Sequence, residues 1–476
     1  MRLPKVALAT VMILTPLASA GTVYTVCPDG SGDFRTIQSA ITAAANGDVI
    51  ELCCDVPFTA AGGNVNISYQ GKAVTVRSAC GDPTRCVIDL QSHSRAFNFT
   101  SSEGPSSVLE GVTIAHGFYW TGPSAIYCEG SSPTIRNCVI YDNGATDGTG
   151  AMTCVSASSP VFEDCLFEGN NVNRGGAGAL SCAGNSNPAL ANCVFRGNGA
   201  TNGTGAMACA SASSPVLENC LFDGNGVNQG GAGALSCAGN SNPALTNCVF
   251  RQNGATVGVG GIECNSSSPT LTGCIFDRNT VNEGGAGAMT FYSGSNASVG
   301  NCTFYDNWAT SGAGALHFNA SSPALDNVII ASWGSHNSAV TCAAGAAPLL
   351  SCCDIFGYSD NWSDCIAGQY GINGNISEDP LFCDMAAGDY TIHADSPCAP
   401  AHSGGCGLIG ALPVGCGESD TGACCFSDGS CVVLGQQECT DQHGTYQGDG
   451  TTCDPNPCHP TPVRITTWGR VRAGFR

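Results

Sequence analysis

The sequence predicts an all-β protein, a right-handed parallel β-helix solenoid whose coils stack on one another. One short phrase recurs between Ser131 and Asn327, in copies such as SSPVFEDCLFEGN and SSPVLENCLFDGN. Its cysteines recur every 26 to 28 residues, at positions 138, 165, 193, 220, 248, 274 and 302. Each copy holds three short apolar pieces separated by Asn, Gly, Ser and Pro. This pattern is typical of strands and turns, and a fixed period of this size is typical of a solenoid.

The three apolar pieces predict three inward-facing columns of residues, because identical positions of stacked coils lie about 4.8 Å apart. The first column is Ile135, Phe162, Leu190, Leu217, Leu245, Leu271, Val299 and Leu325. The second, in which we expect a stack of phenylalanine rings, is Ile140, Phe167, Phe195, Phe222, Phe250, Phe276, Phe304 and Ile330. The third is Met152, Leu180, Met207, Leu235, Ile262, Met289 and Leu316.

Turns between these strands are predicted from Asn and Gly. One asparagine column is expected at a corner, where Asn tolerates a left-handed turn and can bond to the coils above and below. Its members are 137, 192, 219, 247, 301 and 327, with Asp164 and Gly273 as variants. The glycine runs, such as NRGGAGALSCAG, are interpreted as tight turns, since no strand-to-helix context suggests a phosphate loop.

These repeats resemble those of bacterial secreted β-helix proteins of the pectin-lyase-like superfamily. They are most similar to polymorphic-membrane-protein-like repeats, in which SPTLTNCTF and GG-A-I phrases recur. The likeness extends over residues 21–410. That superfamily includes lyases, hydrolases, esterases, adhesins and inert stalks, so the resemblance implies a fold and not an activity.

The sequence predicts four regions: a signal peptide, the β-helix, a small cysteine-rich module and a basic tail. Residues 1–20 have a basic start, an apolar centre and a small-residue end, as in a signal peptide. Residues 21–416 form the β-helix, capped by a helix that starts at Asp33 and ends at Gly47. The phrase DGSGDFRTIQSAI resembles the structural N-terminal cap of pectin methylesterases. Residues 376–416 are expected to cover the last coil, 417–458 to form a small disulfide-rich module, and 459–476 to form a basic tail.

Composition indicates a secreted protein, extracellular or at the cell surface. The chain contains 32 cysteines, which indicates an oxidising compartment. Its net charge of −21 disfavours nucleic acid, which binds basic surfaces. After the signal peptide, no segment is expected to span a membrane as a helix.

The cysteines of each coil occur as a pair 10 or 11 residues apart, and the members of a pair are mostly present or absent together. We therefore predict disulfides within a coil, such as Cys154 to Cys165. The alternative is two ladders of free, buried thiols, which packing alone would permit. A metal site is disfavoured, because the pairs lack CxxC spacing and neighbouring histidines, and no cofactor is predicted.

Two surface features are candidate binding sites. Tyr119 and Trp120 at one end of the array, and Trp308 and Trp333 near the other, are candidates for stacking against a polysaccharide or cell-surface glycan. An outward apolar stripe is a candidate for self-association or for burial under a loop. It consists of Val139, Leu166, Val194, Leu221, Val249, Ile275 and Ile329.

No catalytic residue is assigned. The QDT, DFIFG and GRPW phrases of pectin methylesterases and the NTD and DD phrases of polygalacturonases are absent. The predicted function is therefore a secreted or cell-surface scaffold of structural or adhesive type. The alternative is a divergent polysaccharide lyase or glycoside hydrolase with its site in coils 50–125, where Asp89, Glu103, Glu110 and His116 lie. Two carboxylates about 5 to 10 Å apart in a groove would favour that alternative.

Overall fold

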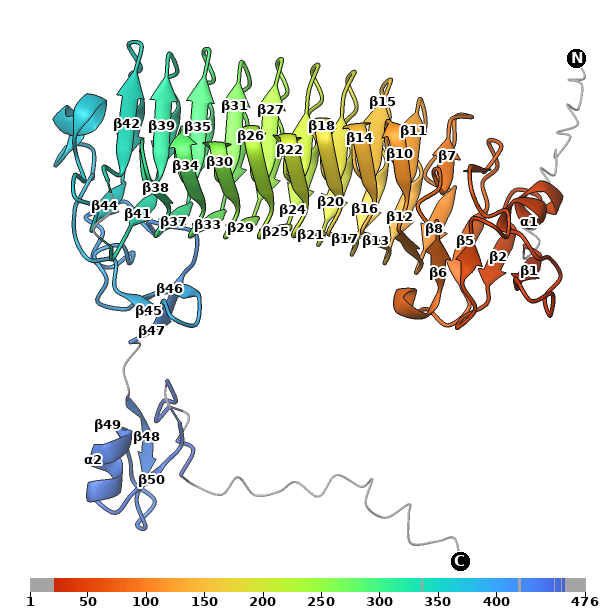
Figure 1. The fold of residues 1–476 in the computed structure, drawn as a ribbon. Coiled ribbons are helices and arrows are strands. Elements are labelled where there is room, and N and C mark those ends of the chain that lie inside the picture. Colours follow the sequence, from red (N-terminus) through yellow and green to blue (C-terminus); the bar gives the residue numbers. More distant parts are fainter. Residues whose placement is uncertain (1–20, 335–336, 418–420, 449, 455, 459–476) are drawn as a thin grey trace, which may run out of the picture.

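A computed structural model describes residues 21–334, 337–417, 421–448, 450–454 and 456–458. The predicted signal peptide and the predicted basic tail both lie outside these residues. The chain from β1 to β44 winds into a rod of stacked coils with four parallel sheets along its length, A to D (Figure 1). This confirms the predicted all-β parallel β-helix.

Sheet A has thirteen strands and contains the first predicted apolar column. Its strands, in sheet order, are β1 (Val23–Val26), β2 (Val49–Leu52), β5 (Thr75–Ser78), β8 (Val108–Glu110), β12 (Thr134–Arg136), β16 (Val161–Glu163), β20 (Ala189–Ala191), β24 (Val216–Glu218), β28 (Ala244–Thr246), β32 (Thr270–Thr272), β36 (Ser298–Gly300), β40 (Ala324–Asp326) and β43 (Leu349–Ser351).

Sheet B has twelve strands and contains the second column. They are β3 (Phe58–Thr59), β6 (Val87–Asp89), β9 (Thr113–Ala115), β13 (Val139–Tyr141), β17 (Leu166–Glu168), β21 (Val194–Arg196), β25 (Leu221–Asp223), β29 (Val249–Arg251), β33 (Ile275–Asp277), β37 (Thr303–Tyr305), β41 (Ile329–Ala331) and β44 (Asp354–Phe356). From Phe167 to Phe304, the centroids of successive rings lie 4.6 to 4.8 Å apart, which confirms the predicted phenylalanine stack.

Sheet C has eleven strands and contains the third column. They are β4 (Ile67–Ser68), β7 (Phe97–Phe99), β11 (Ile126–Glu129), β15 (Met152–Val155), β19 (Leu180–Cys182), β23 (Met207–Cys209), β27 (Leu235–Ala238), β31 (Ile262–Asn265), β35 (Met289–Tyr292), β39 (Leu316–Asn319) and β42 (Val340–Ala343). The inward residues of sheets A, B and C form one continuous buried core.

Sheet D was not predicted, because the glycine runs were interpreted only as turns. Its eight strands are β10 (Phe118–Thr121), β14 (Gly144–Gly148), β18 (Asn171–Ala177), β22 (Gly199–Thr204), β26 (Gly226–Ala232), β30 (Gly254–Val259), β34 (Thr280–Gly284) and β38 (Trp308–Ala309). The inward Ala and Val residues of these strands form a small cluster separate from the main core. The array therefore has four strands in a full coil and not three.

Two asparagine columns occupy different corners. The predicted column is left-handed, with φ from 48° at Asn137 to 66° at Gly273, so the turn conformation is confirmed. Its expected bonding between coils is present from Asn192 Nδ2 to Asp164 Oδ1, at 3.1 Å. The continuous bonded ladder, however, is another column, formed by Asn143, Asn170, Asn198, Asn225, Asn253, Asn279 and Asn307. These side chains are buried, and from Asn143 to Asn279 each amide Nδ2 donates to Oδ1 of the next coil at 2.9 to 3.1 Å.

The within-coil disulfides are a wrong prediction. Cys154 and Cys165 are both free and buried, and each thiol interacts with its own column: Cys154 with Cys128 and Cys182, and Cys165 with Cys138 and Cys193. The stacked register places equivalent cysteines side by side and so favours the alternative, two ladders of thiols. Burial of this kind raises the pKa of Cys86 and of Cys353, each to about 12.

Disulfides are concentrated at the ends of the chain. Two lie among the first coils, Cys27–Cys53 and Cys54–Cys80. Three lie near the end of the rod: Cys342–Cys365, Cys352–Cys406 and Cys383–Cys416.

The N-terminal end of the core is closed by helix α1 (Ile37–Ala43), as expected (Figure 1). Its buried residues are Ile37, Ala40 and Ile41. The start was predicted wrongly at Asp33: that carboxylate instead accepts a bond from the Thr25 amide at 2.8 Å, and Thr36 caps the helix by accepting from the Ser39 amide. A second short helix in the irregular coils, η1, spans Pro83–Arg85.

The C-terminal end of the core is closed by η2 (Asp364–Gln369), whose Ile366 is fully buried. The segment 376–416 was expected to cover this end, but most of it lies against the outer face of sheet B. It contains β45 (Phe382–Asp384), β46 (Asp389–His393) and β47 (Val414–Cys416). We call residues 379–416 the covering segment.

The six cysteines after residue 417 form three disulfides, Cys424–Cys439, Cys425–Cys458 and Cys431–Cys453. The segment folds as a three-stranded antiparallel sheet of β48 (Thr421–Cys425), β49 (Cys431–Gly435) and β50 (Thr445–Tyr446) with helix α2 (Gln436–Asp441). The first disulfide joins β48 to α2, and the other two join the sheet to residues that follow β50. Disulfides substitute here for a core that so short a segment cannot build.

Candidate functional site

The outer face of sheet D carries two outward-facing columns of residues, which we call the D face. Parallel register aligns the first column as Phe118, Gly144, Asn171, Gly199, Gly226, Gly254, Thr280 and Trp308. The second column, two residues further along each strand, is Trp120, Thr146, Asn173, Thr201, Asn228, Thr256, Asn282 and Thr310. After Trp120, hydroxyl and amide side chains alternate from coil to coil.

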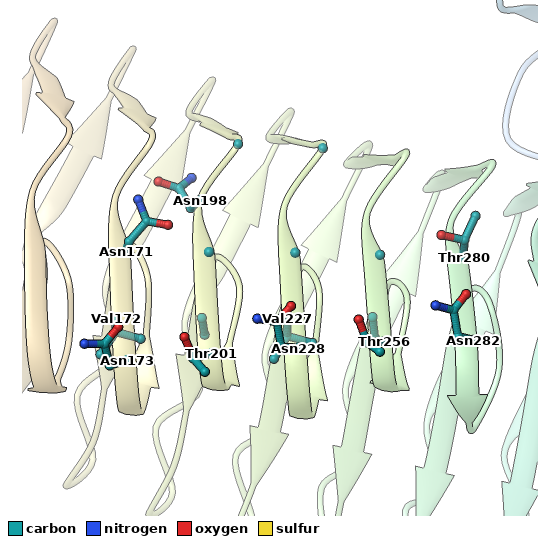
Figure 2. A pocket seen from close by; sticks show the side chains of 17 residues that line it. Asn171, Val172, Asn173, Asn198, Thr201, Val227, Asn228, Thr256, Thr280 and Asn282 are labelled. Atoms are coloured by element: carbon teal, nitrogen blue, oxygen red, sulfur yellow. The ribbon is translucent and has the colours of Figure 1, made fainter.

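A groove of about 700 Å³ lies on this face between β18 and β34. Gly199, Gly226 and Gly254 form its floor; Gly226 has open space above it, and the Asn171 side chain lies against Gly199. Figure 2 shows Asn171 and Thr280 at the two ends of that glycine row, and Asn and Thr side chains along its edge.

The floor glycines differ from the glycines that begin the link to sheet C. A Cβ on Gly226 would meet its nearest neighbour, the Gly254 carbonyl oxygen, at 3.8 Å, an ordinary contact. A Cβ on Gly233 would lie 2.5 Å from the Gly260 carbonyl oxygen, a clash with the next coil. Gly233 is therefore required by the close approach of backbones, whereas the fold leaves Gly226 free to be larger.

The edge of the groove has unused hydrogen-bonding capacity. Among the described residues, the side chains of the five central members of the second column make no hydrogen bond and are exposed: Asn173, Thr201, Asn228, Thr256 and Asn282. Each offers at least one donor and one acceptor to a ligand. None of the described residues that line the groove carries a charge.

Aromatic side chains stand at both ends of the D face. Trp120 is 73% exposed, and its ring packs edge-on against Phe118 at 5.7 Å between centroids. Beside them is a hollow of about 410 Å³, which is also lined by Tyr119, Ser92 and Ser94. The Arg95 guanidinium lies 5.1 Å from the Tyr119 ring centre.

At the other end of the D face, Trp308 occupies the same column as Phe118 and is 36% exposed. Trp333, the fourth aromatic residue predicted to bind, lies elsewhere. Its ring packs against Tyr305, Phe356 and Phe382, the last of these in the covering segment. The structure therefore brings Trp120 and Trp308 to the D face and leaves Trp333 out of it. Tyr119 lies in register with the inward Ala145 and contributes to the wall of the hollow.

The three acids of the alternative enzymatic site, Asp89, Glu103 and Glu110, do not lie together in one site. Asp89 lies on sheet B, where its carboxylate is 3.0 Å from His116 Nδ1. Glu103 is buried and accepts bonds from the amides of Gly71 and Ser101 and from the Ser131 hydroxyl. Glu110 lies on sheet A and pairs with Arg136 at 2.9 Å.

Glu110 does line a cavity of about 350 Å³ together with Glu51 and Arg77, an arrangement that sequence reasoning missed. Arg77 pairs with Glu51 at 2.6 Å, and the sheet register places Arg77 between the two glutamates. Within the described residues, no group of three or more His, Cys, Asp or Glu side chains is arranged to hold a metal ion. Over that same part of the chain, no helix has both the length and the apolar character needed to cross a bilayer.

The groove residues were missed because the glycine-rich links were assigned to turns. A signal was present: the links alternate between forms such as NVNRGG and GATNGT, so that Asn and Thr alternate at one position over successive copies. Aligning the links with one another, as was done for the apolar phrase, would have exposed the column.

The fold and this face define a class of protein: a parallel β-helix with an uncharged groove along one sheet. The chain belongs to the right-handed β-helix region family, whose model matches residues 64–249 and again 124–304, together just over half of the sequence. A search of the curated proteins found no match.

Two solved structures are similar to this chain at 14% identity. One is a rhamnogalacturonan lyase, with a TM-score of 0.41, 65% of this chain covered and 87% of that one. The other is a pectate lyase, with a TM-score of 0.39 and coverage of 83% and 97%.

Proposed function

We propose that this protein is an exported scaffold that binds a glycan along the D face. The observation that carries the proposal is the placement of Phe118 and Trp308 in one column, at opposite ends of a row of small and polar residues. Exposed rings suit the apolar faces of sugars, and the unpaired Asn and Thr side chains suit sugar hydroxyls.

Export is supported by the sequence of residues 1–20 and by the eight disulfides, which are stable in oxidising compartments. The net charge of −21 agrees with a partner other than nucleic acid. That the repeats are of the polymorphic-membrane-protein type, and that the protein is bacterial, both remain predictions.

Self-association through the outward stripe also stays a prediction, now limited to part of it. Ile275 and Ile329 pack under the covering segment, and Val249 lies partly beneath it. Val139, Leu166, Val194 and Leu221 remain as the candidate surface between copies.

The test is a glycan array with the mature protein, followed by affinity measurements on its best ligand. Trp120→Ala and Trp308→Ala should each weaken binding about fivefold, because one aromatic contact is worth about 1 kcal/mol. Tyr141→Ala is the matched control, since this exposed ring lies on sheet B. Equal loss in all three variants, or no glycan bound, would contradict the proposal.

A second candidate function is glycan cleavage at the cavity of Glu51, Arg77 and Glu110. Strands β2 and β8 lie on either side of β5, so the two glutamates are about 10 Å apart along the sheet, near the upper end of the separation used by inverting hydrolases. The same array should be assayed for new chain ends. Cleavage that is lost in Glu51→Gln and Glu110→Gln but retained in Trp120→Ala would favour this candidate.

A further inference from the structure

The groove of the D face lacks charge although the chain as a whole is strongly acidic. We propose that its ligand is a linear, uncharged polysaccharide that lies along the rod axis, across strands β18 to β34. This inference rests on the proposed glycan-binding function and names the class of glycan.

The lack of unpaired cationic side chains in sheet D disfavours acidic polysaccharides. A polyuronate carries a carboxylate on each sugar, and ionised groups bind well only where cationic side chains meet them. The described strands of sheet D hold a single base, Arg174, and two acids, Asp147 and Glu283. Arg174 is already paired with Asp147 at 3.1 Å, and neither residue lines the groove. A polyanion would therefore lose its hydration here and gain no cation in return.

The shape of the groove favours a chain that crosses the strands. The glycine floor extends over consecutive coils, and five strands span about 20 Å at 4.8 Å per coil. Along the edge, hydroxyl and amide side chains alternate, so the surface repeats every two coils, about 10 Å. An extended polysaccharide whose successive sugars are turned over likewise repeats every two sugars. Its hydroxyls can therefore meet equivalent partners along the groove.

The test fills the groove without disturbing the fold. Gly226→Ile adds a β-branched side chain at the floor position where a Cβ has room. Ala189→Ile, at an exposed position of sheet A between Val161 and Val216, is the control that places the same side chain on another sheet. A third variant, Thr201→Ala/Asn228→Ala/Thr256→Ala, removes hydrogen-bond donors and acceptors that the fold does not use.

The probes are uncharged cello-, xylo- and chito-oligosaccharides and acidic oligogalacturonates of equal length, measured by calorimetry on the full chain. We expect at least one uncharged series to bind and the acidic series to fail. Affinity should rise with chain length until the five groove strands are spanned, and rise again when the ligand is long enough to reach Trp308 on β38 or Trp120 on β10. Gly226→Ile and the triple variant should each lower affinity at least tenfold with an unchanged Tm, and Ala189→Ile should have no effect.

The possible failures are distinguishable. If no glycan binds, or if binding is the same in Gly226→Ile as in the unmodified protein, the proposed D-face function itself is wrong. If oligogalacturonates bind at least as well as the uncharged series and Gly226→Ile abolishes that binding, the face is a glycan site but the inferred class of glycan is wrong.

Discussion

The outer faces of sheets B and D belong to the same coils and share one period, yet part of the first is covered by the chain itself and the second is open to solvent. The outward column of sheet B is mostly apolar, and from Val249 onward it lies beneath the covering segment. The outward columns of sheet D are glycine, Asn and Thr, and no described segment covers their central groove. One repeat can thus present both an apolar face, which another segment of the chain covers, and a polar face, which stays accessible to a partner.

Specific contacts hold the covering segment in place. The Ala411 amide donates to the Thr303 hydroxyl at 2.9 Å, and the Gly410 amide donates to the Asn327 carbonyl at 2.9 Å. Beneath the segment, Tyr305 packs against Tyr390 and Phe382. The outward column of sheet B ends at Asp354, which pairs with Ile329 of the preceding coil and has a fully buried carboxyl.

The largest expected effect concerns Asp354. Burial raises its pKa to about 7, against the ordinary 3.8, even though its oxygens contact the Glu378 amide and the Cys398 thiol. The neighbouring carboxylates of Glu378 and Asp379 act in the same direction. The unfolded chain ionises from about pH 4 and the folded chain only near pH 7. The free energy of unfolding should therefore fall over this window, by up to roughly 4 kcal/mol.

Urea unfolding at pH 4 and pH 8 measures this change. Asp354→Asn keeps an acceptor for the Glu378 amide and removes the titration, so it should be as stable as the unmodified chain at pH 4 and more stable at pH 8. If the two proteins have parallel pH profiles, Asp354 does not titrate as inferred. Glycan binding by the D face at pH 8 should be unchanged in the variant.

The next effect is loss of packing beneath the covering segment. Ile329 is 1% exposed, so Ile329→Ala should lower the free energy of unfolding by about 3 kcal/mol, the usual cost of such a cavity. Leu221→Ala is the control on the part of the stripe that is only half-buried, and it should cost clearly less. Thermal unfolding followed by circular dichroism measures both, and equal losses would mean that the segment does not stabilise the stripe.

A smaller effect of opposite sign is expected on the D face. Gly226→Ala removes backbone freedom from the unfolded chain and meets no clash in the fold, so it should stabilise by about 0.5 kcal/mol. Gly233→Ala is its counterpart at a position without room, and it should destabilise strongly. Stabilisation by both substitutions would show that the two glycine columns are equivalent.

The smallest effect is expected at the edge of the groove. Asn228→Ala should change the free energy of unfolding by less than about 0.5 kcal/mol, because surface substitutions away from structural contacts rarely do more. Asn225→Ala, three residues earlier in the buried ladder, should cost about 2 kcal/mol or more, since it leaves buried partners unsatisfied. Denaturant melts of the two variants provide the comparison.

The amino-acid sequence by itself determined the coil. The period of the phrase, the apolar residues two apart, and the Asn or Gly at left-handed corners predicted the strands of sheets A, B and C, the phenylalanine stack and the capping helix. These features depend on short-range chemistry within one coil and on its repetition, both of which are legible in a single chain.

Only the tertiary structure decided what lies beside what. Whether Cys154 faces Cys165 or Cys182 depends on the register between coils, which stacks like upon like. Whether a glycine link is a turn or a strand depends on a neighbouring link with which to pair, as β18 pairs with β22. Which outer face is covered depends on where residues 379–416 pack. These outcomes rest on contacts between residues distant in sequence, and each residue type permits more than one of them.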